Sequence, residues 1–343
     1  MMKISVIGSG SWGIAAAKML CENGHEVTLW SFDEKEAAML QQERENLALL
    51  PGIKLPGQVR VTSDIACVQP AEIAVVATPS FAVFETAQKM RPYLGKKQAV
   101  VLLSKGFDKN SGYSLFSDLL ERVFMGAAPV VALTGPSHAE EVGRGIPTAV
   151  VAASMNKAAA EAVQAAFMNP TFRVYTTPDI VGAELGGAMK NIMALAVGVS
   201  DGAGFGDNTK AMIMTRGIME MARFGVALGG RPETFTGLSG VGDLIVTCIS
   251  QHSRNRRAGL LIGGGTPPEE AIRQVGATVE GYFAAQAVHE LAKGKEVAAQ
   301  LPICQAVYSL LYEGVSLDDT VQALMTRDKK HEIEESWMKH IQW

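Results

Sequence analysis

The chain has 343 residues, of which 48% are hydrophobic and 19% are charged, and its formal net charge is −4 at pH 7. This length allows two domains, each with a core of its own. The slightly acidic balance gives no bulk attraction to nucleic acid or to an anionic membrane, so any phosphate must be recognised by a local basic cluster. The scattered cysteines fit a reducing, cytoplasmic compartment and do not fit a structural metal site: Cys21, Cys67, Cys248 and Cys304.

The first predicted element is a buried strand over residues 4–7, followed by a helix that includes residues 15–20. A glycine-rich turn joins them, in which Gly8, Gly10 and Gly13 form the pattern G-x-G-x-x-G. In such a turn Gly8 makes the tight bend, Gly10 lets the backbone approach a pyrophosphate, and Gly13 lets the helix pack on the strand. Free N–H groups at the helix start favour an anion. The setting predicts a dinucleotide site, although such a turn also occurs for packing alone.

Short β-branched runs then alternate with helical patterns up to residue 177. This alternation is typical of a mostly parallel sheet with helices on both faces. We therefore predict an α/β, Rossmann-like, dinucleotide-binding domain over residues 1–178. The expected strands are 25–30, 72–78, 98–104, 129–134, 147–153 and 172–177, and the expected helices are 33–42, 81–90, 114–124 and 156–167.

Beyond residue 178 the strand signal stops and helical patterns take over, which predicts an all-α substrate and catalytic domain over residues 179–343. The most apolar stretch, 192–199, is too short to span a bilayer, and the first residues lack a signal peptide, so we expect no membrane insertion. The charged tail 327–343 is expected to lie on the surface or to fray. The expected helices are 180–200, 207–228, 231–238, 253–262, 267–274, 278–293, 302–312 and 317–325.

Ligands of open parallel sheets lie beyond the carboxyl ends of the strands, so the residues that follow each strand are candidates for a site. Lys105 follows one strand in SKGFD, and Gly135 and Ser137 follow another in TGPSHAEEV. They offer a cation, a backbone N–H and a hydroxyl. A solvated loop lysine and a Gly-Pro turn remain alternative interpretations.

In the helical half, Lys190 and Asn191 interrupt a small, apolar helix that also contains the pair Gly186 and Gly187. Glycine inside a helix costs about 1 kcal/mol relative to alanine, so the pair indicates that something packs close to the backbone. A cleft between the domains explains both features, although Lys190 could also reach water along a packed helix. Asp243 follows a glycine-rich turn, where an N-cap role is the alternative to a role in the site.

A basic cluster follows in HSRNRRAG, with Arg254, Arg256 and Arg257 beside Ser253 and Asn255. Guanidinium groups and N–H groups at a helix start together can bind a phosphomonoester. A surface salt-bridge face is the alternative. The cluster is local and lacks interleaved aromatic residues, so nucleic-acid binding is not expected.

Several motifs, in one order, resemble the bacterial NAD(P)-dependent glycerol-3-phosphate dehydrogenase family. The resemblance covers residues 3–330 and rests on GSGSWGIA, SKGF, TGPSHAEEV, GGAMKNIMALAVGVSDG, GLSGVGDLIVTC, SRNRRAG and VEGY. It implies reversible reduction of dihydroxyacetone phosphate to sn-glycerol 3-phosphate, the precursor of phospholipids, with NAD or NADP as the cofactor.

The resemblance also implies residue roles. Lys190 would donate and accept the catalytic proton, together with Asp243. The substrate phosphate ester would be held by Lys105, Gly135, Ser137, Lys190, Asp243, Ser253, Arg254 and Asn255. The cofactor would be held at Gly8, Gly10, Ser11, Trp12, Gly13, Phe32, Lys105, Ala139, Arg254, Thr278 and Glu280, where Thr278 replaces a residue that is more often aliphatic in the family.

Phe32 stands where many relatives carry an arginine or a histidine, and Asp33 follows it. A basic residue there would pair with the 2′-phosphate of NADP, whereas an acidic residue near the end of the second strand suits the free ribose hydroxyl of NAD. We therefore expect activity with NAD at least equal to that with NADP.

Two other functions compete with this interpretation. One is a two-domain reductase of the β-hydroxyacid or ketopantoate type, which would act on a carboxylate in place of a phosphate ester. The other is a non-catalytic nucleotide-sensing module, which would not need Lys190 and Asp243. The apolar, methionine-containing helical domain also makes a homodimer possible, although methionine stripes more often belong to a core.

Overall fold

Eight strands form one sheet in the N-terminal half of the chain, in the order β10-β9-β8-β5-β4-β1-β2-β3. The computed structural model describes residues 1–95, 98–329 and 331–332. Neighbouring strands are parallel except for β8 and β9, so β9 and β10 run opposite to the other six. The strands are β1 (Lys3–Ile7), β2 (Glu26–Trp30), β3 (Arg60–Thr62), β4 (Ile73–Val76), β5 (Ala99–Leu102), β8 (Val130–Thr134), β9 (Thr148–Ala153) and β10 (Phe172–Thr177).

Helices cover both faces of this sheet, as the run of apolar residues in each central strand requires. Alternate residues face opposite sides: Val75 and Val101 belong to one core cluster, whereas Val76 and Leu102 belong to another. The first cluster contains residues of α1 (Ser11–Glu22), α2 (Glu34–Glu43), α5 (Ala139–Gly143) and α6 (Lys157–Phe167), and the second contains residues of α3 (Val83–Met90) and α4 (Phe116–Phe124). The predicted Rossmann-like fold is confirmed.

The glycine-rich turn between β1 and α1 has the geometry that its sequence predicts. Gly8 has a φ of +120°, and a Cβ there would lie 2.8 Å from the carbonyl oxygen of Ala77. A Cβ on Gly13 would lie 1.8 Å from the carbonyl oxygen of Gly8, so α1 packs directly on the turn. At Gly10, by contrast, a Cβ would have nothing within 4 Å. Gly8 and Gly13 are therefore needed for packing, while Gly10 leaves open space above the turn.

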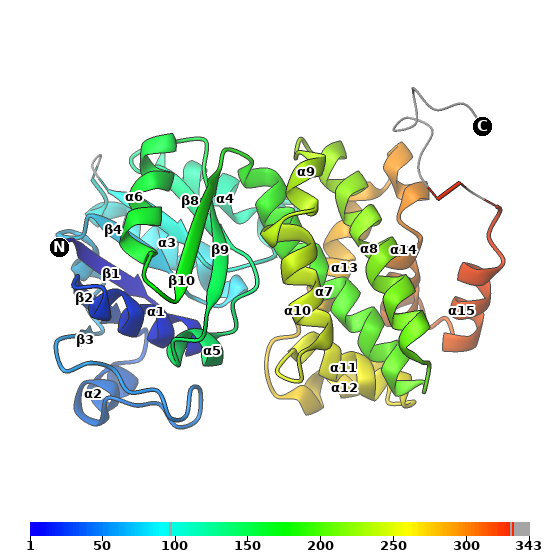
Figure 1. The fold of residues 1–343 in the computed structure, drawn as a ribbon, viewed down its shortest axis with the longest axis horizontal. Coiled ribbons are helices and arrows are strands. Elements are labelled where there is room, and N and C mark those ends of the chain that lie inside the picture. Colours follow the sequence, from blue (N-terminus) through cyan, green and yellow to red (C-terminus); the bar gives the residue numbers. More distant parts are fainter. Residues whose placement is uncertain (96–97, 330, 333–343) are drawn as a thin grey trace.

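The C-terminal half is a helical bundle around α7 (Ile180–Gly202), which lies beside the sheet in Figure 1. At 23 residues this helix is longer than the apolar stretch predicted at 192–199 and is long enough to cross a membrane, but 94% of its most apolar window is buried inside the protein. The other helices are α8 (Asp207–Ala227), α9 (Pro232–Phe235), α10 (Asp243–Ile249), α11 (Arg254–Gly263), α12 (Pro268–Val275), α13 (Glu280–Ala292), α14 (Pro302–Tyr308) and α15 (Leu317–Met325).

Glycines let α11 approach α7 to backbone contact. A Cβ on Gly198 would lie 2.2 Å from the carbonyl oxygen of Arg256, and one on Gly259 would lie 2.2 Å from that of Leu195. This contact fixes the start of α11 against the middle of α7. The basic cluster is thereby held near the polar residues of α7.

The structure differs from the predicted elements at a few places. The helix predicted at 231–238 ends at Phe235, and a π-helical turn, Leu238–Gly242, follows it because Gly237, Gly240 and Gly242 give this segment little helix propensity. The apolar residues after that turn form α10, and Arg60–Thr62 forms β3; neither was predicted. The predicted tail at 327–343 lies largely outside the described residues, which end at 331–332.

Replacing Gly13 with alanine should destabilise the protein. The new Cβ has no room against the Gly8 carbonyl group, and overpacking of this kind costs about 1–3 kcal/mol. Gly10→Ala is the matched control: its Cβ meets open space, and we expect it to cost less than about 1 kcal/mol, the loss of a glycine N-cap. Urea unfolding measures both values, and equal losses for the two variants would contradict this account of the turn.

Candidate active site between the sheet and the helices

The carboxylate of Asp243 bridges two lysines that come from different halves of the protein. One oxygen, Oδ1, accepts a hydrogen bond from Nζ of Lys190 on α7, and the other, Oδ2, accepts one from Nζ of Lys105, at 2.6 Å. Lys105 follows β5 at the carboxyl end of the sheet. The structure therefore brings together three of the residues singled out in the sequence, separated by up to 138 positions.

Both Asp243 and Lys190 are buried, with relative exposures of 1% and 7%. Burial lowers the pKa of Lys190 to about 8; the Asp243 carboxylate opposes this shift and the Lys105 charge adds to it. Burial would raise the pKa of Asp243, but the two ammonium groups outweigh it and hold that pKa below its usual value. Lys190 does not reach bulk water, and it can both give and take a proton near neutral pH.

The glycine pair in α7 allows the close approach that its sequence indicates. A Cβ on Gly186 would lie 2.3 Å from the carbonyl oxygen of Ser239, and one on Gly187 would lie 3.3 Å from Cδ of Lys105. Asp243 is the first residue of α10, and no side chain caps that helix. Its carboxylate points to the lysines and does not serve as an N-cap.

A series of hydrogen bonds connects the glycine-rich turn to this cluster. Nε1 of Trp12 donates to the carbonyl oxygen of Ser137 at 2.8 Å, and Oγ of Ser137 donates to the carbonyl oxygen of Gly135 at 3.0 Å. The same Gly135 oxygen accepts from Nζ of Lys105 at 3.3 Å. The turn after β1 therefore contacts the loop after β8, and that loop contacts Lys105 of the cluster.

The start of α11 faces the same region. Ser253 caps this helix, and Asn255 donates to Oδ1 of Asn191 at 2.9 Å and accepts from the N–H of Gly281 at 2.8 Å. Arg254 is exposed beside them. The structure thus places beside α7 the three polar residues predicted for the phosphate, Ser253, Arg254 and Asn255.

Arg256 does not belong to the group of arginines that could bind a phosphate, although the sequence motif includes it. Its guanidinium group donates to Oδ2 of Asp201 from Nε at 3.0 Å and from Nη2 at 2.6 Å. This pair uses the Nε and Nη2 edge of the Arg256 guanidinium group and holds α11 to α7. Arg254 and Arg257 remain exposed in the cluster.

Glu280 connects α13 to the sheet half. Its Oε1 accepts a hydrogen bond from Oγ of Ser80 at 2.7 Å. Burial raises the pKa of Glu280, and that hydrogen bond and the charge of Arg254 oppose the shift.

Three further residues predicted for the cofactor lie at the starts of helices. Thr278 is half-buried just before α13, and Ala139 is buried at the start of α5. Ser11 begins α1, and its Oγ donates to the carbonyl oxygen of Leu49 at 2.7 Å.

His138 belongs to the same region, although it was not selected from TGPSHAEEV as a site residue. Its Nε2 is buried without a hydrogen-bond partner. Burial lowers the pKa of His138, and the nearby charge of Lys190 adds to the shift. A neutral imidazole therefore lies within the electrostatic reach of the lysine cluster. Its position directly after a strand end is the signal that could have identified it.

Phe32 and Asp33 follow β2. The ring of Phe32 is 72% exposed, and Nζ of Lys89 lies 4.6 Å from its centroid. Asp33 caps α2, since its Oδ1 accepts the N–H groups of Lys35 at 2.7 Å and Glu36 at 2.9 Å. One oxygen of the carboxylate predicted to bind a ribose hydroxyl is therefore used to cap the helix that it starts.

The residues around Gly10 fit a dinucleotide. Gly10 is the N-cap of α1, no side chain caps this helix, and the space beside Gly10 is open. The N–H groups of the first turn therefore face that space, where the helix dipole favours a pyrophosphate.

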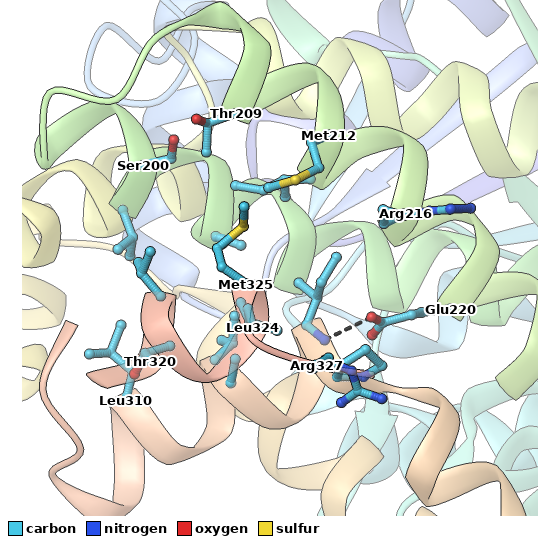
Figure 2. A pocket seen from close by; sticks show the side chains of 18 of the residues that line it. Ser200, Thr209, Met212, Arg216, Glu220, Leu310, Thr320, Leu324, Met325 and Arg327 are labelled. Atoms are coloured by element: carbon cyan, nitrogen blue, oxygen red, sulfur yellow. Dashed lines mark hydrogen bonds between the residues drawn. The ribbon is translucent and has the colours of Figure 1, made fainter. Parts of the chain in front are cut away.

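A separate cavity of about 660 Å³ lies in the helical half. Figure 2 shows Met212 of α8 and Met325 of α15 pointing into it. Its lining includes none of the residues predicted for the site, and its walls are mostly apolar. The cavity shares no residue with the lysine cluster or with the glycine-rich turn, so the lysine cluster is the candidate active site.

Both halves of the chain match models of one family. Residues 3–160 match the N-terminal model, and residues 179–322 the C-terminal model, of NAD-dependent glycerol-3-phosphate dehydrogenase. A glycerol-3-phosphate dehydrogenase [NAD(P)+] of Desulfitobacterium hafniense is 51% identical over 335 residues, which are 98% of this chain and 94% of the relative. One of Fusobacterium nucleatum is 47% identical over 98% of this chain and 100% of the relative.

The fold also agrees with a solved structure of that family. The crystal structure of glycerol-3-phosphate dehydrogenase from Coxiella burnetii superposes with a TM-score of 0.88 at 36% identity, and the match covers 95% of this chain and 99% of that one. A reductase of the β-hydroxyacid or ketopantoate type is not favoured, because both halves match the same dehydrogenase. The chain belongs to the NAD-dependent glycerol-3-phosphate dehydrogenase family.

Proposed function

We propose that this chain interconverts dihydroxyacetone phosphate and sn-glycerol 3-phosphate, and that Lys190 transfers the proton. The observation that carries the proposal is the bridge from Lys190 through Asp243 to Lys105, at the meeting point of the two halves. The cluster offers two ammonium groups and one carboxylate beside the open glycine-rich turn. That combination suits a reaction in which negative charge develops on a ketone oxygen.

A nicotinamide dinucleotide, when bound at the glycine-rich turn, would supply or accept the hydride. As a C–H bond forms at the ketone carbon, the electrons of the C=O π bond move to the oxygen, and the Nζ proton of Lys190 is transferred to that oxygen. Lys105 adds a second positive charge. In the oxidative direction neutral Lys190 takes the hydroxyl proton, and its lowered pKa favours that form. Asp243 orients both lysines throughout.

The substrate phosphate would lie at the start of α11. Arg254 supplies an exposed guanidinium group, and the helix start supplies N–H groups beside Ser253 and Asn255. Binding the phosphate away from the reacting carbon fixes the carbonyl group against the lysines. Lys105, Gly135 and Ser137 would complete the substrate site. Ser11, Trp12, Ala139, Thr278 and Glu280 would contact the cofactor.

We further propose a cytoplasmic enzyme that supplies glycerol 3-phosphate for phospholipid synthesis. The free cysteines among the described residues support a reducing compartment. The boundary between the two domains would lie between β10 and α7, near residue 178. A homodimer stays a prediction.

Lys190→Ala should lower kcat for the reduction of dihydroxyacetone phosphate by about 10²–10⁴-fold, the usual contribution of a positioned general acid. Dinucleotide binding should change little, because the glycine-rich turn is intact. Absorbance of NADH or NADPH follows turnover. Lys210→Ala is the control, since Lys210 pairs with Asp201 away from the cluster and should keep full activity. Full turnover by Lys190→Ala would refute the proposed mechanism.

The pH dependence should report the Lys190 pKa of about 8. Reduction needs the ammonium form, so its kcat/KM should fall as the pH rises through about 8, whereas oxidation needs the neutral amine and should rise there. Asp243 raises the pKa of Lys190, so Asp243→Asn should move the alkaline limit of reduction to lower pH. Asp201→Asn, the control, should leave the alkaline limit of reduction unchanged. If that limit did not move in Asp243→Asn either, the assignment of this pKa to Lys190 would be contradicted.

Arg254→Ala should lower kcat/KM for dihydroxyacetone phosphate by about 10- to 150-fold, which corresponds to about 1.5–3 kcal/mol for hydrogen bonds to a charged group. Unphosphorylated dihydroxyacetone should be used equally well by the variant and the wild type. Arg257→Ala, the exposed neighbour, should change the phosphate ester's kcat/KM by less than about threefold, as expected of a surface charge. Equal losses on both substrates would remove the phosphate role from Arg254.

A further inference from the structure

We propose that Glu36 is the residue that reads the adenosine ribose and makes this enzyme prefer NAD(H) to NADP(H). The inference rests on the proposed function. Sequence position alone pointed to Asp33, which caps α2 through Oδ1 and lies in an exposed position. Glu36, in the first turn of the same helix, turns back toward the sheet.

The carboxylate of Glu36 lies at the ends of β1 and β2. These strands are parallel neighbours, with Ile7 opposite Trp30, so the residues that follow them are adjacent. Oε2 of Glu36 accepts from Oγ of Ser9 at 2.6 Å and from Oγ of Ser31 at 2.5 Å. Ser9 stands between Gly8 and Gly10, within the glycine-rich turn itself. The charge is therefore fixed beside the place where the pyrophosphate would bind.

A third contact orients the other oxygen. Nδ2 of Asn46 approaches Oε1 of Glu36 at 3.4 Å. Ser9, Ser31 and Asn46 are all buried, whereas Glu36 is only half-buried. The hydrogen bonds from Ser9 and Ser31 occupy both lone pairs of Oε2. Oε1 has only the 3.4 Å contact with Asn46 and can therefore accept a further hydrogen bond. The carboxylate is held in one position and still offers an acceptor at the surface of the turn.

A fixed carboxylate at this position discriminates between the two cofactors. In dinucleotide-binding folds, an acidic residue beyond the second strand accepts a hydrogen bond from the ribose 2′-hydroxyl group of NAD. A 2′-phosphate has no such donor when ionised and adds about 1.5–2 negative charges at pH 7. Placed beside Glu36, it would meet like-charge repulsion in a partly desolvated site.

The other charges around this edge are cations and carboxylates on α2 and α3. Lys89 lies over the ring of Phe32, and Lys35, Asp33 and Glu34 lie in exposed positions at the start of α2. Lys89 and Lys35 are the cations at this edge that could attract a 2′-phosphate. Lys89 lies against an exposed ring, and within the described residues no hydrogen bond or ion pair holds the amine of either lysine, whereas three side chains fix Glu36. We therefore expect the fixed carboxylate of Glu36 to decide the preference between NAD(H) and NADP(H).

The test is direct binding to the full-length protein, measured by isothermal titration calorimetry. The probes are NAD⁺, NADP⁺ and the fragments adenosine 5′-monophosphate and adenosine 2′,5′-bisphosphate. The variants are Glu36→Gln, which keeps the shape and a hydrogen-bond acceptor, Glu34→Gln, which removes an exposed charge from the same helical turn, and Lys89→Met. Thermal unfolding verifies that each variant is folded.

We expect the wild type to bind NAD⁺ at least about tenfold more tightly than NADP⁺. Glu36→Gln should shrink that ratio by about tenfold, mainly through tighter binding of NADP⁺ and of the bisphosphate fragment. Glu34→Gln and Lys89→Met should change it by less than about threefold. The ratio of the two affinities in the wild type is measured without any variant. It therefore tests the inference even if Glu36→Gln does not fold.

Tighter binding of NADP⁺ by the wild type, or a ratio that Glu36→Gln leaves unchanged, would overturn the inference. A ratio that Lys89→Met alone reverses would assign selection to Lys89 and would overturn it too. These outcomes are distinct from a failure of the proposed function, in which the protein would bind neither dinucleotide or would not turn over dihydroxyacetone phosphate.

Discussion

The active site depends on one buried carboxylate shared by two lysines from different parts of the fold. Without Asp243, the ammonium groups of Lys105 and Lys190 would repel each other across a region with little water. With it, both lysines are held at the same place while keeping a net positive charge. Because Lys105 follows a strand and Lys190 lies in the longest helix, the same interaction also fixes the sheet against the bundle.

Other buried polar contacts across this boundary support that arrangement. Thr134 at the end of β8 and Ser239 share a hydrogen bond of 2.6 Å, and Ser80 donates to Glu280. Glu184 of α7 accepts from the N–H of Ser117, near the start of α4, at 3.1 Å. A different docking of the halves that kept these groups buried but broke their pairing would leave them unsatisfied. The boundary is therefore a specific interface, with its polar groups directed at one another around the site.

The sequence predicted what local patterns determine. The glycine-rich turn, the alternation of strands and helices, and the change to helices after residue 178 all follow from periodicity and from glycine sterics. The sequence could not predict that Asp243 and Lys105, 138 positions apart, would pair, because no local pattern encodes that contact. The same limit applies to Arg256, whose distant partner Asp201 removes it from the phosphate cluster. The cap that Asp33 makes on α2 is a local contact, and the N-cap preference of aspartate could have indicated it.

The central claim is that Lys190 and Asp243 act as one unit, and a double-mutant cycle on kcat/KM for dihydroxyacetone phosphate measures this most directly. Residues that act together give non-additive losses. We expect the Lys190→Ala, Asp243→Ala double variant to be about as active as the worse of the two single variants. Losses that multiply in the double variant would show that the two side chains contribute independently, and would contradict the account.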